Sequence, residues 1–246
     1  MVQNLTLPLT IKAIKVDPDF DFAKYIQLFT PQVIKSIYSY KFHKDQVVKF
    51  CSELLKRYYL SDLSQQDPND LDITYNKYDK PFLKQQCRIP HSKSNYTNDK
   101  RRSLHDVNEE EGKHAGEFGL GCGIKFNISH AKEYVVIAVI DDPDYEIGID
   151  IEYVDRKSTD FRDLAKIVYS DYELAQIKDV NDFYNFWTKK ESLIKARGTG
   201  FGEDFYKTTN LTLDDHIQTE NHMIYTTLFK NDYYISICLL QQNKQY

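Results

Sequence analysis

The sequence of 246 residues lacks several features or contains few of them, and each such absence excludes some classes of protein. Its four cysteines show no paired spacing, which indicates neither a zinc site nor a disulfide framework. No apolar run approaches the ~18 residues of a membrane span, and the N-terminus lacks the basic start and long apolar core of a signal peptide. Glycine, proline and methionine are scarce, which is ordinary for a globular protein. A soluble cytoplasmic protein without a membrane partner is therefore expected.

An excess of positive charge is missing as well. The formal net charge is −5, so no general polyanion-binding surface is expected and no nucleic acid partner. A G-x-x-x-x-G-K-[ST] loop is also absent, which argues against a P-loop nucleotide hydrolase. The length allows a real core, as one large domain or as two lobes of about 120 residues.

The most organised stretch of the chain, from Phe183 to Gly200, has the pattern of an amphipathic helix. Asn181 or Asp182 offers an N-cap, and Gly198 with Gly200 offers a C-terminal stop. One apolar stripe contains Phe183, Phe186, Trp187 and Ile194. Glu191 and Lys195 lie along its border, and such a pair at i,i+4 is by itself an ordinary helix-stabilising contact worth about 0.2–0.5 kcal/mol.

A second acidic stretch, residues 146–154, alternates like a β-strand. One face carries Ile147, Ile149 and Ile151, and the other carries Gly148, Asp150 and Glu152. A solvated strand face accounts for the two acids equally well. The bare glycine beside them, however, leaves room for close approach to the backbone.

Three carboxylates share one site if the helix lies beside this strand: Asp150, Glu152 and Glu191. Two like charges at 4 Å repel by about 4 kcal/mol at an effective dielectric constant near 20, so such a cluster needs a cation. Oxygen ligands alone favour Mg²⁺ before Ca²⁺, and Mg²⁺ usually binds together with substrate phosphates. The sequence thus raises the hypothesis of a metal site, which depends on the fold bringing the helix to the strand.

The remaining periodicities predict an α+β fold. Strands are expected over residues 5–16, 71–83, 133–140, 146–154, 208–213 and 223–240, and helices over 31–40, 42–60 and 158–180. The strand at 133–140 is expected to form an antiparallel hairpin with the acidic strand. A helix pair followed by strands occurs twice, which suggests a duplicated α/β lobe.

The polar segment at 84–123 has no sustained periodicity, so we interpret it as an insertion that is mobile in its middle and can be shortened with little loss of turnover. Its runs of like charge favour solvation over function. Just after it, His130 is a lone histidine, more often structural than functional. Ser129 and His130 make a poor nucleophile pair, because adjacent residues of an extended chain point to opposite faces.

Three short motifs carry a family resemblance. F-N-I-S-H at Phe126–His130, G-I-D-I-E at Gly148–Glu152 and W-T-K-K-E-S-L-I-K at Trp187–Lys195 resemble the signature motifs of the 4′-phosphopantetheinyl transferases, in the same order. The match is to the larger, two-lobed kind, and most similar are stand-alone fungal members that activate aminoadipate reductase. The resemblance implies two similar α/β lobes with the active site in the cleft between them, divided here into residues 1–123 and 124–246.

The implied reaction transfers phosphopantetheine from coenzyme A to a serine of an acyl or peptidyl carrier domain and releases 3′,5′-ADP. By resemblance, Asp150, Glu152 and Glu191 hold Mg²⁺ against the pyrophosphate, Glu191 also serves as the base, and Lys195 neutralises the phosphates. Such chemistry needs charge neutralisation and alignment more than covalent help. The implied enzyme is a monomeric holo-[acyl-carrier-protein] synthase that serves lysine biosynthesis.

The resemblance also implies contacts to coenzyme A. His130 binds one of its phosphates and acts in catalysis, Asn127 and Ser129 lie near the nucleotide, and Lys80, in a K-P turn like the family's G-K-P, faces the 3′-phosphate or adenine. Lys190 is a further phosphate contact, although its helical angle places it nearer the apolar stripe.

Two departures from the family pattern concern the first lobe: Asp79 replaces a glycine, and Tyr75 replaces a basic residue. The basic residue expected before the long first-lobe helix is Lys35, Lys41 or Lys44, between which the sequence does not choose. A non-catalytic carrier- or nucleotide-binding module and another Mg²⁺-dependent phosphate-transfer enzyme remain as alternatives. Mitochondrial and fatty-acid carriers remain as alternative acceptors.

Overall fold

The computed structural model describes residues 8–84, 123–200 and 209–242, and within these ranges the chain has a mixed α+β fold, as expected. The segment at 85–122, most of the expected insertion, lies outside the described residues. The first half contains β1 (Leu9–Lys15), a 3-10 helix η1 (Phe22–Leu28), α1 (Pro31–Tyr38), α2 (His43–Ser64), β2 (Ile73–Tyr75) and β3 (Pro81–Leu83). The second half contains β4 (Ile124–Ala131), β5 (Tyr134–Asp141), β6 (Tyr145–Tyr153), α3 (Phe161–Val168), α4 (Asp171–Leu174), α5 (Val180–Arg197), β7 (His216–Gln218), β8 (His222–Phe229) and β9 (Tyr233–Gln241).

The strands form two larger antiparallel sheets and one small hairpin. The first sheet has the order β1-β5-β4, the second has the order β6-β9-β8-β7, and β2 pairs with β3. The expected hairpin between β5 and the acidic strand β6 is wrong. Both edges of β5 are already occupied, by β1 and by β4, so β6 pairs along its whole length with β9 instead. Strands β4 and β5 follow residue 123 in the chain but share a sheet with β1, so this sheet crosses the boundary expected between residues 123 and 124.

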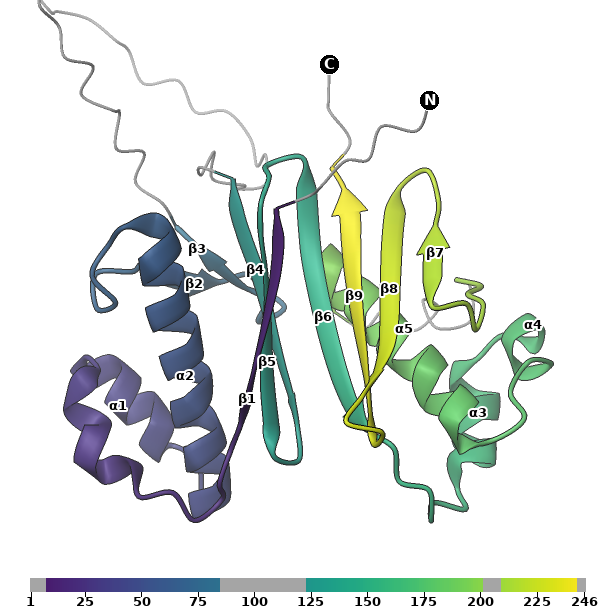
Figure 1. Cartoon of the computed structure of the whole chain (residues 1–246), viewed down its shortest axis with the longest axis horizontal. Coiled ribbons are helices and arrows are strands. Elements are labelled where there is room, and N and C mark those ends of the chain that lie inside the picture. Colours follow the sequence, from purple (N-terminus) through teal and green to yellow (C-terminus); the bar gives the residue numbers. More distant parts are fainter. Residues whose placement is uncertain (1–7, 85–122, 201–208, 243–246) are drawn as a thin grey trace, which may run out of the picture.

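The two sheets pack face to face, with helices on their outer sides (Figure 1). Strand β5 shows how the layers arise from its alternation. Its side chains Val136, Ala138 and Ile140 enter the core between the sheets, together with Ile147, Ile149 and Ile151 of β6. The alternate residues of β5 face α1, α2 and the β2–β3 hairpin in two further clusters. The predicted two-faced character of β6 is therefore confirmed.

Helix α5 closes the outer side of the second sheet. It begins earlier than expected, because the Asp179 carboxylate accepts hydrogen bonds from the backbone N–H groups of Asn181 and Asp182 in a capping box. It ends at Gly198, as expected, which adopts the left-handed conformation with φ of 62°. The helix predicted over 158–180 is interrupted, since Tyr169 is extended between α3 and α4.

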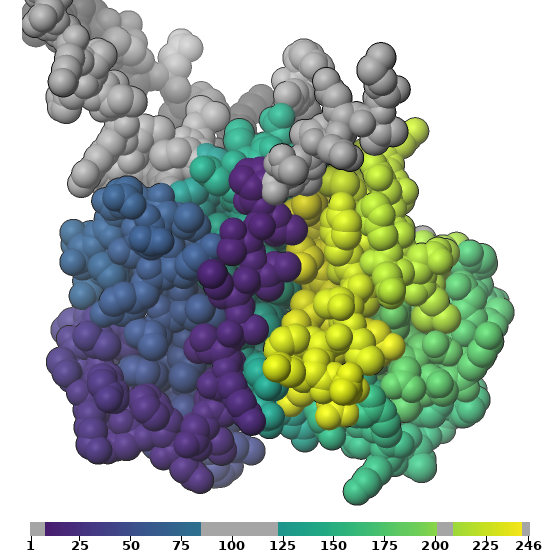
Figure 2. Space-filling model, viewed as in Figure 1, coloured from purple at the N-terminus to yellow at the C-terminus, as the bar shows by residue number. Residues whose placement is uncertain are grey.

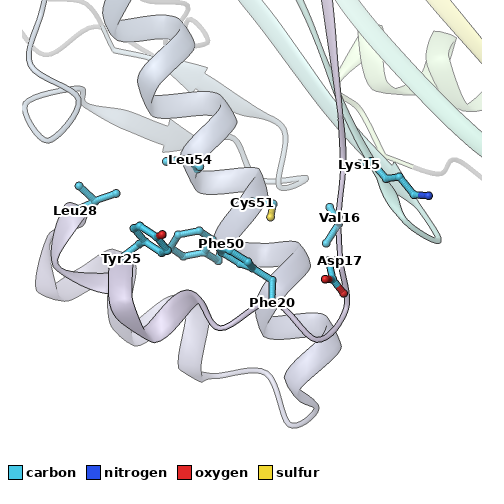
Figure 3. Close-up of a pocket in the computed structure, with 9 residues that line it drawn as sticks. All are labelled: Lys15, Val16, Asp17, Phe20, Tyr25, Leu28, Phe50, Cys51 and Leu54. Atoms are coloured by element: carbon cyan, nitrogen blue, oxygen red, sulfur yellow. The ribbon is translucent and has the colours of Figure 1, made fainter.

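Two surface features complete the fold. Figure 2 shows β1, the edge strand of the first sheet, lying at the surface between α2 and the strands β8 and β9. A pocket of about 310 Å³ opens between β1, η1 and α2, and Phe20, Tyr25, Phe50 and Leu54 contribute to its mainly apolar lining (Figure 3). None of its lining residues comes from β4, β6 or α5. No helix in the described ranges is long and apolar enough to cross a membrane.

Candidate active site at the junction of β4, β6 and α5

The candidate site lies where β4, the edge strand of the first sheet, meets β6, the edge strand of the second sheet. On the edge of β6 that is not paired with β9, the Ile149 N–H donates a hydrogen bond to a side chain of β4. The acceptor is Oδ1 of Asn127, at 3.0 Å. Two residues further along β4, Ser129 Oγ donates to Asp150 Oδ1 at 3.0 Å. Asn127 thus fastens β4 to β6, and this contact places Ser129 beside the first acidic residue.

Gly148 lets α5 pack directly on β6. A Cβ atom at this position would lie 2.0 Å from the carbonyl oxygen of Ser192 and 2.4 Å from the backbone nitrogen of Ala196. The space expected beside this glycine is therefore filled by the backbone of the helix. This close approach brings the helix to the acidic strand, which is the arrangement that the metal-site hypothesis required.

Lys195 of α5 reaches across to Asp150. Its Nζ lies 2.6 Å from Asp150 Oδ1 and 2.9 Å from Ser129 Oγ. Asp150 is only 3% exposed, and its other oxygen, Oδ2, is buried without a hydrogen-bond partner among the residues that the structure describes. Burial raises the pKa of Asp150 above its ordinary value, although Lys195 and Ser129 oppose the shift. One carboxylate oxygen is thus paired with an ammonium group, and the other has no such counter-charge in the described part of the chain.

Glu152 and Glu191 lie next to this pair. Trp187, expected only on the apolar stripe, donates its Nε1–H to Glu152 Oε1 at 3.1 Å, because a buried indole N–H needs an acceptor. Burial raises the pKa of Glu152 to about 7, and the negative charges of Asp150 and Glu191 add to this effect. Glu191 is itself 7% exposed on α5. The negative charges of Asp150 and Glu191 therefore both act on Glu152.

The donor chemistry of this group fits a hard cation. All candidate ligands are oxygen atoms, one buried carboxylate oxygen has no hydrogen-bond partner among the described residues, and neighbouring negative charges raise the pKa of Glu152. The arrangement of the side chains is less complete. In the part of the chain that the structure describes, no three His, Cys, Asp or Glu side chains converge closely enough to hold a metal ion.

His130 borders the same site from β4. Ser129 is buried and His130 is exposed, as the alternation of an extended chain predicts. The pKa of His130 is lowered, first by partial desolvation and then by the positive charge of Lys195, while Asp150 and Asp45 act in the opposite direction. Asp45, the more distant source of this effect, lies in the first turn of α2.

Two predicted ligand-binding lysines have protein partners. Lys190 is fully buried, with its Nζ 2.9 Å from Glu173 Oε2 and 2.9 Å from the carbonyl oxygen of Thr209. Neighbouring residues on a helix point about 100° apart, so Lys190 enters the core beside α4 while Glu191 faces the site. The expectation that Lys190 contacts phosphate is therefore corrected. Its buried acidic partner was not singled out from the sequence.

Lys80 lies in the turn between β2 and β3, and its ammonium group is held at two points. Its Nζ is 2.6 Å from Glu146 Oε2 and 2.7 Å from the carbonyl oxygen of Ala196 at the end of α5. Asp79 next to it has a φ of 62°, in the left-handed region that favours glycine and that aspartate tolerates. The three alternatives for the basic residue of the first lobe, Lys35, Lys41 and Lys44, are all exposed.

Comparison with known proteins supports the resemblance in the C-terminal part of the chain. Residues 146–246 match the family model of the 4′-phosphopantetheinyl transferase superfamily. An L-aminoadipate-semialdehyde dehydrogenase-phosphopantetheinyl transferase of Xenopus laevis is 29% identical over 142 residues, which cover 46% of this chain and 46% of that protein. The counterpart of Rattus norvegicus is 32% identical over 123 residues, 39% of each chain.

A bacterial relative shows the same similarity. The 4′-phosphopantetheinyl transferase AcpT of Salmonella typhi is 34% identical over 95 residues, 36% of this chain and 47% of that protein. The chain spans about half the length, or less, of the curated relatives it matches.

Proposed function

We propose that this chain, whose residues 146–246 match the family model of the 4′-phosphopantetheinyl transferase superfamily, transfers phosphopantetheine from coenzyme A to a serine of a carrier domain and releases 3′,5′-ADP. The observation that carries this proposal is the contact of Lys195 with Asp150 and Ser129, which joins the three motifs of the resemblance at one place. The two helix-covered sheets are then the two lobes, and the acceptor and coenzyme A meet where the edge strands β4 and β6 come together beside α5.

The proposed metal is Mg²⁺, held by Asp150 through its unpartnered Oδ2, by Glu152 and by Glu191. When bound, it neutralises the pyrophosphate and orients it for attack. Glu152, with its pKa raised to about 7, is then a carboxylate whose ionisation that cation favours.

The remaining steps belong to side chains of this chain. Glu191 accepts the proton of the acceptor serine, directly or through water, as the hydroxyl attacks the β-phosphate of coenzyme A. Lys195, already within reach of Asp150, moves its ammonium group toward the phosphates and stabilises the departing 3′,5′-ADP. His130, exposed beside Lys195, contacts a phosphate of coenzyme A, and Ser129 holds Lys195 and Asp150 in register.

The preferred acceptor is the carrier domain of aminoadipate reductase, because several relatives carry aminoadipate-semialdehyde dehydrogenase in their names. A cytoplasmic monomer that serves lysine biosynthesis is part of this proposal. The names of the bacterial relatives do not mention aminoadipate-semialdehyde dehydrogenase, so other carrier domains are alternative acceptors.

The test is intact-mass spectrometry of apo carrier domains incubated with the protein, coenzyme A and Mg²⁺, with Glu191→Gln as the matched variant. We expect each accepted carrier to gain one phosphopantetheine, and the gain to disappear with EDTA or in Glu191→Gln. If a folded protein that binds coenzyme A modifies no carrier, a binding module replaces the transferase. Release of nucleotide products without carrier modification would instead indicate a hydrolase.

A further inference from the structure

We propose that the β2–β3 turn, residues 76–80, is a clamp that caps the C-terminal end of α5 and positions the side chains of that helix in the site. Lys80 is then a positioning residue that acts through α5. This inference rests on the proposed transferase for its kinetic consequences, but the clamp itself is a structural claim that can be tested without activity.

The turn is internally rigid because one side chain organises it. Asn76 accepts two backbone hydrogen bonds through its Oδ1, from Tyr78 N–H at 2.9 Å and from Lys80 N–H at 3.0 Å. The backbone N–H groups of Asn76 and Asp79 close the turn with bonds to the carbonyl oxygens of Lys80 and Asn76, both at 3.0 Å. The turn therefore presents its side chains in a fixed direction.

Two of these side chains satisfy carbonyl groups at the end of α5. Asn76 Nδ2 donates to the carbonyl oxygen of Gly198 at 2.7 Å, and Lys80 Nζ donates to that of Ala196 at 2.7 Å. The last carbonyls of a helix have no partner within the helix and carry partial negative charge, so an amide and an ammonium group are suitable donors. The partners lie more than 110 residues apart in the chain, so this cap is supplied by tertiary structure.

Lys80 also ties the end of α5 to the start of the acidic strand. Its Nζ forms an ion pair with Glu146 Oε2 at 2.6 Å, and the other oxygen of Glu146 is 3.0 Å from Lys125 Nζ. The side chains of Lys80 and Glu146 are 12% and 17% exposed, so solvent screens this pair only weakly. One ammonium group thus fixes the helix that carries Glu191 against the strand that carries Asp150.

The chain after α5 is shaped to receive the turn. A Cβ atom on Gly198 would lie 2.7 Å from Lys80 Cδ and 3.1 Å from Asn76 Nδ2, and one on Gly200 would lie 2.8 Å from Tyr78 Cδ1. Both glycines have positive φ, of 62° and 66°. Lys195 directly precedes the clamped carbonyl of Ala196, so a shift of this helix end displaces the ammonium group that contacts Asp150.

Two roles for Lys80 give different kinetics. The family resemblance implies that Lys80 contacts the 3′-phosphate of coenzyme A directly. In that case Lys80→Met raises KM for coenzyme A, and the enzyme no longer prefers coenzyme A to 3′-dephospho-coenzyme A. The clamp predicts that kcat falls about 10- to 100-fold, because small misplacements of reacting groups are costly, while KM and the preference change little. Lys84→Met, an exposed lysine of the same hairpin, is the matched control and should change neither.

Hydrogen–deuterium exchange tests the clamp without any turnover. In Lys80→Met we expect the amides at the C-terminal end of α5, including the Gly198 N–H bonded to Ile194, to exchange about fivefold faster or more, as loss of about 1 kcal/mol implies. Asn76→Asp keeps the acceptor that organises the turn and removes the donor to Gly198, so it should have the same effect. This second variant applies if Lys80→Met does not fold.

The outcomes separate the two proposals. Unchanged exchange in both variants, or kinetics of Lys80→Met equal to those of Lys84→Met, would overturn the clamp while leaving the transferase intact. Raised KM with loss of the dephospho-coenzyme A discrimination would assign Lys80 to ligand binding. If the wild-type protein modifies no carrier, the proposed transferase activity is wrong. Faster hydrogen–deuterium exchange in the variants would still establish the clamp.

Discussion

The Nζ of Lys195 on α5 lies 2.6 Å from Oδ1 of Asp150 on β6, although 45 residues separate the two in the sequence. The Asp150 side chain is 4% exposed and that of Lys195 is 30% exposed. The contact therefore places a buried carboxylate beside a cation that can still reach a ligand at the surface.

Replacing Lys195 by methionine should lower the free energy of unfolding by about 2 kcal/mol at pH 7, because Asp150 is left buried without its counter-charge. Urea denaturation of Lys195→Met, Asp150→Asn and the double variant measures this coupling, with the exposed Lys157→Met as control. Purely additive effects of the two substitutions would contradict the pairing.

The titration of Glu152 should make stability depend on pH. Its pKa is raised from an ordinary value of 4.5 to about 7 in the folded protein, so between these values the folded state holds a proton that the unfolded state has lost. The stability that protonated Glu152 contributes is therefore fully present below pH 4.5 and is lost as the pH rises through 7, at a cost of roughly 3 kcal/mol.

Glu152→Gln isolates this effect, since the amide oxygen still accepts the Trp187 N–H. We expect the wild type to lose stability relative to Glu152→Gln as the pH rises from 4.5 to 7.5, measured by denaturation at a series of pH values. Saturating Mg²⁺ with coenzyme A should reduce the difference if Glu152 is a metal ligand. Parallel pH profiles for the two proteins would show that Glu152 titrates normally.

Gly148→Ala should destabilise the protein by about 3 kcal/mol or more, because its Cβ would collide with the backbone of Ser192 and Ala196. Gly123→Ala is the control, since its nearest neighbour, Asp141 Oδ1, belongs to a side chain that can move. Chemical denaturation of both variants gives the comparison. Equal midpoints for the two would mean that α5 does not lie directly on β6.

Lys190→Met should cost about 3–5 kcal/mol of stability, because the fully buried Glu173 would lose its counter-charge. Adding Glu173→Gln should recover much of the loss, since a neutral amide still accepts the Leu211 N–H. Denaturation midpoints measure both effects, and the exposed Lys166→Met serves as control. A stable Lys190→Met protein with a raised KM for coenzyme A would restore Lys190 as a phosphate contact.

The sequence alone determined those features that depend on a few neighbouring residues. The alternation of Ile147, Ile149 and Ile151 assigned the faces of β6, and Gly198 marked the end of α5. Side-chain period and the left-handed preference of glycine are local properties, so they can be read without the rest of the chain. The three carboxylates were found for the same reason, since each occupies a regular position on a single element.

Only the tertiary structure decided which elements meet. The edges of β5 were taken by β1 and β4, so β6 joined β9, and this choice depends on competition among strands far apart in the chain. The partners of three lysines followed from the same packing: Lys195 with Asp150, Lys190 with Glu173, and Lys80 with Glu146. The sequence shows the same residue type at all three positions. Only the surroundings of each lysine determine whether it binds a ligand, neutralises a buried acid or caps a helix.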